Sequence, residues 1–314
     1  MSAHTFCIAS LSDVGRVRNR NEDACREFEN AAGRRLLVLA DGMGGHRAGA
    51  TASRVTVETI GEIFHHPDSA SEDPDSLLRR AVETANTRVH EMAKQDAELR
   101  GMGTTAVALL LAPDGRGWVA HVGDSRAYRY RDNQLGALTS DHSVVAELER
   151  RGLISAEQAA VHPRRNEILR CVGIDAQVEV DAAAVDLLPG DRFLLCSDGL
   201  SCMLDEIEIA VILDDHPPAE AARLLVERAN EHGGHDNVTV QVVEVVAGVA
   251  GLEMEEGVET VEIVDGVQKT PAASRSGDAR PPADLEGSQP RRVLWLAASV
   301  AAAVIALALL WWRG

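Results

Sequence analysis

The sequence predicts a layered protein in which helices are inserted between antiparallel β-hairpins. Apolar runs of strand length alternate with stretches of helical periodicity over residues 1–246. Two short turn sequences, APDG at 112–115 and RDNQ at 131–134, each reverse the chain between strand-like runs. Hydrophobic residues make up 45% of the chain and aromatic residues only 3%, so the core must be mainly aliphatic. The order of elements favours a layered α/β arrangement over a strict βαβ repeat.

The expected strands are runs rich in Val, Leu and Ile that are bounded by Gly, Pro or Asp. They cover residues 4–10, 35–40, 104–111, 117–122, 127–131, 178–186, 192–196 and 238–246. The expected helices cover 48–64, 75–99, 142–151, 156–160, 205–213 and 219–231. In the second of these helices, Leu78, Val82 and Val89 recur at helical spacing, which indicates a face turned toward the core.

Charge and cysteine usage exclude several functional classes. The net charge of -18 argues against nucleic acid as a partner, because phosphate binding needs an excess of Lys and Arg. The five cysteines are odd in number and have no C-x-x-C spacing, which argues against a disulfide framework and a zinc site. Reduced thiols in a cytosolic compartment are the better interpretation.

The composition divides the chain into three parts. Residues 1–246 are expected to fold as one domain, and 247–292 are acidic and then rich in Pro, Ser, Gly and Arg, as in a disordered linker. Residues 293–312 carry no charge, and at about 1.5 Å per residue a helix of this length spans roughly 30 Å. They are predicted to form a transmembrane tail anchor. The preceding Arg291 and Arg292 favour a cytoplasmic domain on a single-pass protein of the cell membrane.

Four aspartates mark the ends of apolar runs and are each followed at once by Gly, Ser or Asn. They are Asp41, Asp124, Asp198 and Asp236, and Asp23 lies in the segment RNRNEDA. Strands that end in this way bring carboxylates to one edge of a sheet, where they repel one another unless a cation lies between them. Any one of these segments could be an ordinary turn. Together they favour a site for hard divalent metals bound by oxygen ligands.

The neighbouring residues indicate what such a site would bind. The glycine at Gly42 lets the backbone approach a ligand, so its carbonyl can join Asp41 at a metal. The guanidinium of Arg18 matches the geometry of phosphate oxygens. Two divalent ions about 3.5–4 Å apart can activate a water and neutralise a phosphate. The sequence has no Lys-bearing phosphate loop and no plausible Ser-His-Asp set, so metal-assisted hydrolysis of a phosphoester fits best.

The chain resembles the metal-dependent protein phosphatases (PPM, type 2C), and most of all the bacterial stand-alone enzymes. The resemblance covers about residues 5–246 and lies in the ordered segments RNRNEDA, ADGMGG, GMGTT, HVGDSR, LTSDHS, LLCSDGL and GGHDNVT. It implies an α+β fold, an αββα sandwich of two antiparallel sheets flanked by helices. It also implies two Mn²⁺ or Mg²⁺ ions in the cleft between the sheets, with a weaker third site.

The resemblance also implies roles for individual residues. Asp41 would bridge both metals, the Gly42 carbonyl would bind one ion, and Asp198 and Asp236 would bind the other. Asp23 resembles the acid that holds a water at the metals, with Glu22 beside it, and Asp124 matches a ligand of the third metal. Arg18 matches the phosphate-binding Arg, whereas Thr105 and Asp141 are expected to be supporting residues. Many eukaryotic members have a His where this chain has Met43, and residues 162–173 resemble the family's flap.

The predicted function is a membrane-tethered protein phosphatase for phosphoserine and phosphothreonine. Its partners would be phosphorylated proteins, with a bacterial Ser/Thr kinase that it opposes and the substrates of that kinase. One alternative is a catalytically silent scaffold that binds phosphoproteins at the membrane, but such scaffolds lose metal carboxylates that this chain keeps. Another is a phosphatase of small phosphoesters, which the sequence does not separate from the first.

Overall fold

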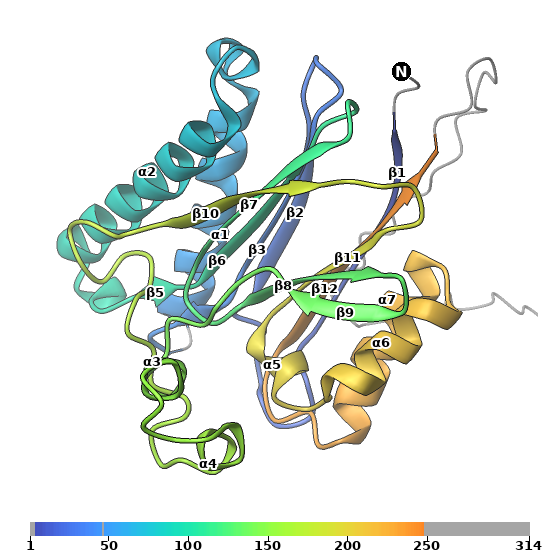
Figure 1. The fold of residues 1–314 in the computed structure, drawn as a ribbon. Coiled ribbons are helices and arrows are strands. Elements are labelled where there is room, and N and C mark those ends of the chain that lie inside the picture. Colours follow the sequence, from blue (N-terminus) through green and yellow to red (C-terminus); the bar gives the residue numbers. More distant parts are fainter. Residues whose placement is uncertain (1–3, 46, 248–314) are drawn as a thin grey trace, which may run out of the picture. The chain divides into compact units, whose positions relative to one another are not determined.

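Two five-stranded antiparallel sheets lie face to face, and a pair of helices covers the outer side of each (Figure 1). The strand order is β1-β12-β11-β8-β9 in one sheet and β10-β7-β6-β3-β2 in the other, with a short β4-β5 pair beside them. The computed structural model describes residues 4–45 and 47–247. Within these residues the predicted sandwich of two antiparallel sheets flanked by helices is confirmed.

The strands are mostly those that the apolar runs predict. Their bounds are β1 Thr5–Asp13, β2 Ala24–Glu29, β3 Arg35–Ala40, β4 Gly42–Met43, β5 Gly103–Thr104, β6 Ala106–Leu111, β7 Arg116–Val122, β8 Arg126–Arg131, β9 Gln134–Ala137, β10 Asp181–Asp186, β11 Arg192–Cys196 and β12 Val238–Val246. The α-helices are α1 Arg47–His65, α2 Pro74–Gln95, α3 Val144–Arg150, α4 Ala156–Ala160, α5 Asp198–Ser201, α6 Glu206–Asp215 and α7 Pro218–Glu231. Two 3₁₀ turns, η1 Pro67–Ala70 and η2 Ala97–Leu99, flank α2.

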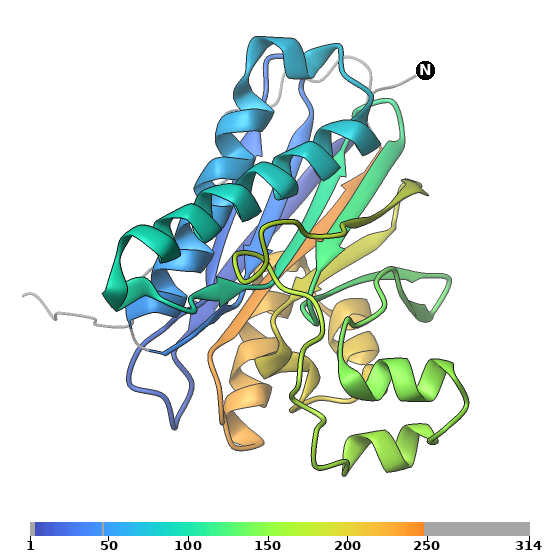
Figure 2. The same ribbon diagram turned by 90° about the vertical axis from the view of Figure 1, so that its left-hand side faces the viewer.

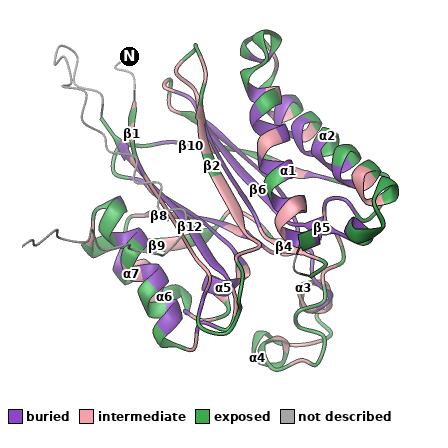
Figure 3. Cartoon of the chain, turned by 180° about the vertical axis from the view of Figure 1, so that it is seen from behind, coloured by how far each residue is buried: buried purple, intermediate pink, exposed green. Residues whose placement is uncertain are grey.

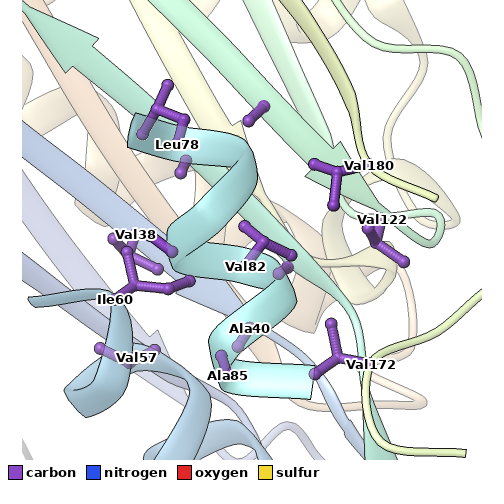
Figure 4. Close-up of a cluster of buried hydrophobic side chains, with 14 of the residues drawn as sticks. Val38, Ala40, Val57, Ile60, Leu78, Val82, Ala85, Val122, Val172 and Val180 are labelled. Atoms are coloured by element: carbon purple, nitrogen blue, oxygen red, sulfur yellow. The ribbon is translucent and has the colours of Figure 1, made fainter. Parts of the chain in front are cut away.

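Three hydrophobic clusters fill the spaces between the layers, and the alternation of side chains along the strands explains how one strand contributes to two of them. In β3, Leu36 and Val38 pack toward α1 and α2, whereas Leu37 and Leu39 pack against the opposite sheet. Because successive strand residues point to opposite faces, a strand covered on both sides must be apolar throughout. Figure 3 shows this burial along the central strands, and Figure 4 shows side chains of α2 and β3 in contact. A third cluster fills the space under α6 and α7.

The two predicted reversals are confirmed. Residues 112–115 join β6 to β7, which pair from Leu111 opposite Gly117 onward. Asp132 and Asn133 both have positive φ, at 51° and 60°, and they connect β8 to β9. Two consecutive left-handed residues form the tight turn that suits the twist of a hairpin.

The sequence prediction missed β2, the short elements β4, β9 and α5, and misplaced one helix end. Strand β2 lies at the edge of its sheet and has the charged sequence ACREFE, which carries little apolar signal. The helix expected over 75–99 ends at Gln95, because the Asp96 side chain accepts a hydrogen bond from the Glu98 N–H and begins η2.

The predicted location in the cell membrane is corrected. No helix within the described residues is long and apolar enough to cross a membrane. Even α2, with 22 residues, carries the exposed Arg80 and Arg88 and packs its apolar face on the sheet. Its half-buried Arg79 donates to the carbonyls of Val180 and Ala182 at β10. The predicted linker, 247–292, and the predicted span, 293–312, lie outside the described residues, apart from residue 247.

Helices α3 and α4 stand apart from the sandwich, below its lower edge (Figure 2). They belong to residues 144–173, which contain the predicted flap at 162–173 and which we call the flap segment. The isolated β-bridge between Ser143 and Ile168 brings the two ends of the segment together, and the bridge between Thr104 and Val172 joins it to β5. The C-terminal end of the segment therefore lies beside the short β4–β5 pair.

The helix-to-sheet core predicts a stability effect for Leu78→Ala. Leu78 is 1% exposed in the cluster between α2 and the sheet, so its truncation leaves a cavity. We expect the free energy of unfolding to fall by about 2–5 kcal/mol in urea titrations of the full chain. The matched control is Ile207→Ala, at a side chain that is 77% exposed, for which we expect a change within about 0.5 kcal/mol. Equal effects of the two variants would contradict the assigned core.

Candidate functional site

All five predicted aspartates lie at the same end of the two sheets. Asp23 and Asp41 are neighbours, because Ala24 at the start of β2 pairs with Ala40 at the end of β3. Asp198 follows β11 and Asp236 precedes β12, and these strands pair with Cys196 opposite Val240. Asp124 follows β7 at the corresponding end of the other sheet. The strand ends therefore bring these aspartates to one end of the sandwich, as expected.

Burial and mutual repulsion disfavour the charged forms of these carboxyls. Burial is the largest cause in each case, and it raises the pKa of Asp41 well above its usual range. Burial, together with the charges of Asp198 and Asp236, raises the pKa of Asp23 to about 7. Burial also raises the pKa of Asp124 to about 7, with Asp198 and Asp141 adding to the effect. The pKa of Asp198 is raised by burial and by Asp236.

The carboxylates contain buried oxygens that no protein group satisfies. Asp23 Oδ1 and Asp198 Oδ1 are both buried and accept no hydrogen bond. Leaving such an acceptor unpaired is unfavourable by about 1–3 kcal/mol, and more for a charged group. Hard divalent cations bind oxygen donors of this kind, and a cation would also remove the repulsion among the carboxylates. The residues present therefore fit a metal centre.

The main chain of Asp41 is held firmly by two threonines. Thr104 Oγ1 donates to the Asp41 carbonyl at 2.7 Å, and the Thr105 N–H donates to the same oxygen at 2.9 Å. The Asp41 N–H in turn donates to Thr105 Oγ1 at 2.9 Å. Thr105 Oγ1 also lies 2.7 Å from Ser125 Oγ, next to Asp124. Thr105 thus connects two of the carboxylate-bearing turns.

Gly42 is a glycine because of close backbone contacts. A Cβ at this position would lie 2.3 Å from the Gly49 carbonyl oxygen and 2.5 Å from that of Glu22. The Glu22 side chain lies against α1, since a Cβ on Gly49 would be 2.0 Å from Glu22 Oε2. Glu22 therefore supports the packing of the α1 N-terminus, and Gly42 lets the backbone pass beside Asp41.

Arg18 lies at the opening of the carboxylate cluster. Its Nη2 donates to Asp236 Oδ2 at 2.7 Å, and the Arg18 side chain is 54% exposed. An exposed ion pair of this kind is weak, so the guanidinium can exchange this partner for another anion.

Asn237 organises the loop that carries Arg18 and Asp23. Its Nδ2 donates to the carbonyls of Val14 and Arg20, both at 2.9 Å, and its Oδ1 accepts from the Glu22 N–H at 2.8 Å. Thr239 Oγ1 donates to Asp23 Oδ2 at 2.6 Å. Sequence analysis did not single out either residue, although Asn237 directly follows Asp236. Their role depends on contacts with the distant N-terminal loop, which sequence spacing does not reveal.

Asp141 has a different partner from the other acids. It receives two hydrogen bonds from Arg126, at 2.9 and 2.8 Å, and Arg126 also donates to the Tyr128 hydroxyl at 3.0 Å. A paired carboxylate of this kind stabilises the wall beside Asp124. Asp141 therefore acts as a support for Arg126 in the described structure.

A cavity of about 520 Å³ begins at the carboxylate cluster and extends under the flap segment. Asp124 and Asp198 lie at its inner end, and α3, α4 and the start of α6 supply much of the rest. The side chains of Glu149, Arg165 and Glu206 also line it. The cavity gives an extended molecule access to the carboxylates.

The raised pKa values predict how pH affects the metal-free protein. Asp23 and Asp124 have a pKa of about 7 when folded and about 4 in an unfolded chain, so the folded protein binds more protons between these values. Stability is greatest at low pH within this window and falls as the pH rises through about 7. We expect the Tm of the EDTA-treated protein to fall between pH 5.5 and 8. Mn²⁺ should raise the Tm most at pH 8, because protons no longer compete with the metal for the carboxylates there.

The variant Asp23→Asn tests the assignment of this pH effect. It removes one titrating group and should flatten the decline in Tm without metal. A metal-free Tm that stays constant or rises over this pH range in differential scanning fluorimetry would contradict the electrostatic account.

The sequence and the fold are similar to those of known proteins over most of the described chain. Residues 16–232 match the protein phosphatase 2C family. A serine/threonine phosphatase, stp, of Listeria welshimeri is 41% identical over 236 residues, which are 74% of this chain and 93% of the relative. The structure of the Streptococcus agalactiae serine/threonine phosphatase is similar with a TM-score of 0.72 and 38% identity, over 76% of this chain and 99% of that one.

A second solved structure bears on the metal. The catalytic domain of the serine/threonine protein phosphatase PstP in complex with 2 manganese ions is 37% identical, with a TM-score of 0.68. The similarity covers 77% of this chain and 99% of that domain. Phosphatases of this family use Mn²⁺ or Mg²⁺ as cofactors. On its sequence and its fold, the chain belongs to the protein phosphatase 2C family.

Proposed function

We propose that this protein hydrolyses phosphoserine and phosphothreonine in other proteins with the help of two divalent metal ions. One observation carries the proposal: Asp23 and Asp198 each hold a buried, unpaired oxygen in a cluster of carboxylates that opens into a long cavity. Family membership supports the same activity. A catalytically silent scaffold would not require these oxygens to stay unpaired.

The metal roles are assigned to the residues that converge at this edge. Asp41 would bridge the ions, the Gly42 carbonyl would complete one site, and Asp198 and Asp236 would form the other. Asp124, which lines the cavity together with Asp198, would serve a third and weaker ion. When bound, the ions lower the pKa of a water and withdraw negative charge from the phosphoryl group.

The protein's own groups prepare the reaction. The Asp41 main chain is fixed by Thr104 and Thr105, so its carboxylate has little freedom. Asp23 is held by Thr239 and can orient a water through its other oxygen. Arg18 would leave Asp236 and donate to phosphoryl oxygens, which a guanidinium binds in a forked geometry.

The cavity supports a protein substrate over a small phosphoester. It extends from Asp198 to the flap segment, well beyond the space that a phosphate needs. A polypeptide on either side of the phosphorylated residue would fill this extension. The reaction reverses that of a protein Ser/Thr kinase, so such a kinase and its substrates are the proposed partners.

The first functional prediction concerns Asp41→Asn. The full chain should hydrolyse a phosphothreonine peptide with Mn²⁺, and EDTA should abolish the release of phosphate. Asp41→Asn should lower kcat by about 10²–10³-fold or more, since one preorganised electrostatic group typically contributes this much. The control is Asp114→Asn, an exposed carboxylate in the turn between β6 and β7, which should keep wild-type activity. Undiminished turnover in EDTA would refute the metal mechanism.

The second concerns Arg18→Ala. Loss of a charged hydrogen bond to phosphate should weaken binding by about 1.5–3 kcal/mol, which is about tenfold or more in KM. Arg18→Lys should recover part of this loss, because it keeps the charge without the fork. Arg223→Ala, on the outer helix α7, is the matched control. If Arg18→Ala and Arg223→Ala have equal KM values, Arg18 does not bind the phosphate.

A further inference from the structure

A group of polar side chains outside the carboxylate cluster joins three segments of the chain. His121 of β7 and His142 stack at 4.5 Å between ring centroids, with an interplanar angle of 22°. Asp181 at the start of β10 approaches His142, with Nε2 and Oδ2 3.2 Å apart. Arg170 Nη1 donates to Asp181 Oδ1 at 2.8 Å. His121, His142 and Asp181 are close enough together to suggest a metal site.

The hydrogen bonds favour a different role. The Gly123 N–H donates to His142 Nδ1 at 3.1 Å, so this nitrogen carries no proton and Nε2 carries it. His121 Nε2 lies 3.0 Å from the Ser140 carbonyl oxygen, which can only accept, so this ring nitrogen carries the hydrogen that is donated. Arg170 already supplies a positive charge to Asp181. His142 Nδ1 and both oxygens of Asp181 are thus engaged, and Arg170 Nη1 lies 3.3 Å from His142 Nε2, so the group is a hydrogen-bond network.

His142 is the centre of this network. Its side chain is nearly buried, and burial and the neighbouring His121 lower its pKa, which keeps the ring neutral. Its main-chain N–H donates to the Gly123 carbonyl at 3.0 Å, and its carbonyl accepts from the Leu169 N–H at 2.7 Å. One residue therefore contacts the Gly123 turn, the C-terminal part of the flap segment and β10.

The two ring nitrogens act on different parts of the site. Nδ1 holds the turn that ends in Asp124, at the inner end of the cavity. Nε2 faces Asp181, and Asp181 also accepts a hydrogen bond from Arg170, which lies near the C-terminal end of the flap segment. The Nδ1 contact bears on the position of Asp124, and the Nε2 contact bears on the position of the flap segment.

We propose that His142 is a positioning residue that sets the Asp124 turn and the flap segment independently, through one hydrogen bond at each ring nitrogen. The consequence for activity rests on the proposed function. The Nδ1 contact would govern the response to metal through Asp124, and the Nε2 contact would govern the binding of the substrate protein through the cavity wall.

Two variants of the full chain separate the contacts. His142→Asn places an amide oxygen near Nδ1, so it can accept from Gly123 but cannot reach Asp181. His142→Gln places its amide near Nε2, so it can donate to Asp181 but leaves the Gly123 N–H without its acceptor. Asp181→Ala, at a half-exposed side chain, removes the same contact as His142→Asn together with the Arg170–Asp181 ion pair, so it tests the link from Asp181 to the flap segment even if the His142 variants fold poorly.

The primary measurement is amide hydrogen exchange, which does not depend on activity. His142→Asn and Asp181→Ala should speed exchange by about tenfold in residues 167–173 and leave 121–125 unchanged, because the lost contact is local. His142→Gln should speed exchange by about tenfold in residues 121–125 and leave 167–173 unchanged. If His142→Asn and His142→Gln give the same pattern, or if neither changes either segment, the proposal is wrong.

Kinetics with a phosphorylated protein test the consequence separately. His142→Asn and Asp181→Ala should raise KM about fivefold with an unchanged Mn²⁺ concentration for half-activation, since one neutral or charged hydrogen bond is lost. His142→Gln should raise that Mn²⁺ concentration about fivefold with little change in KM. An inactive wild-type protein would refute the proposed function while leaving the exchange result to decide the positioning role.

Discussion

Repulsion among carboxylates that have been removed from water is the constraint on which the rest of this structure depends. The fold brings Asp23, Asp41 and Asp198 together at one edge of the sandwich, where burial makes each charge unfavourable. No side chain among the described residues donates to Asp23 Oδ1 or Asp198 Oδ1, both of which are buried. Divalent cations would both relieve the repulsion and supply the chemistry of the proposed hydrolysis, so the same feature would destabilise the metal-free protein and support its activity.

The layers of the fold serve this arrangement. Strands β3, β7 and β11 are buried along their length, so their ends are fixed by packing on both faces. Turns that follow such strands inherit this rigidity, and short hydrogen bonds extend it to the functional groups. Thr105 connects Asp41 to the Asp124 turn, and Asn237 fixes the loop that carries Arg18. Preorganisation of this kind is what electrostatic catalysis requires.

Sequence reasoning predicted the parts of the site that are encoded locally. A buried strand that ends in Asp-Gly is visible in a few residues, so Asp41 and Asp198 could be found from the sequence. Strand β2 could not, because its charged edge sequence carries no apolar pattern. Asn237 and Thr239 were missed because their partners lie near the other end of the chain. The pairing of Asp141 with Arg126 and the network at His142 likewise depend on tertiary contacts.

The most direct test of the central claim is the release of protons when the metal-free full chain binds Mn²⁺. Asp23 and Asp124 have a pKa of about 7 without metal, so at neutral pH each is partly protonated. Asp124 must lose its proton to bind a cation, and Asp23 must lose its proton when cations bind beside it. Isothermal titration calorimetry in buffers of different ionisation enthalpy measures this release. The account predicts saturable binding with protons released, and a smaller release in Asp23→Asn. Absence of saturable binding, or binding with no proton release at neutral pH, would contradict it.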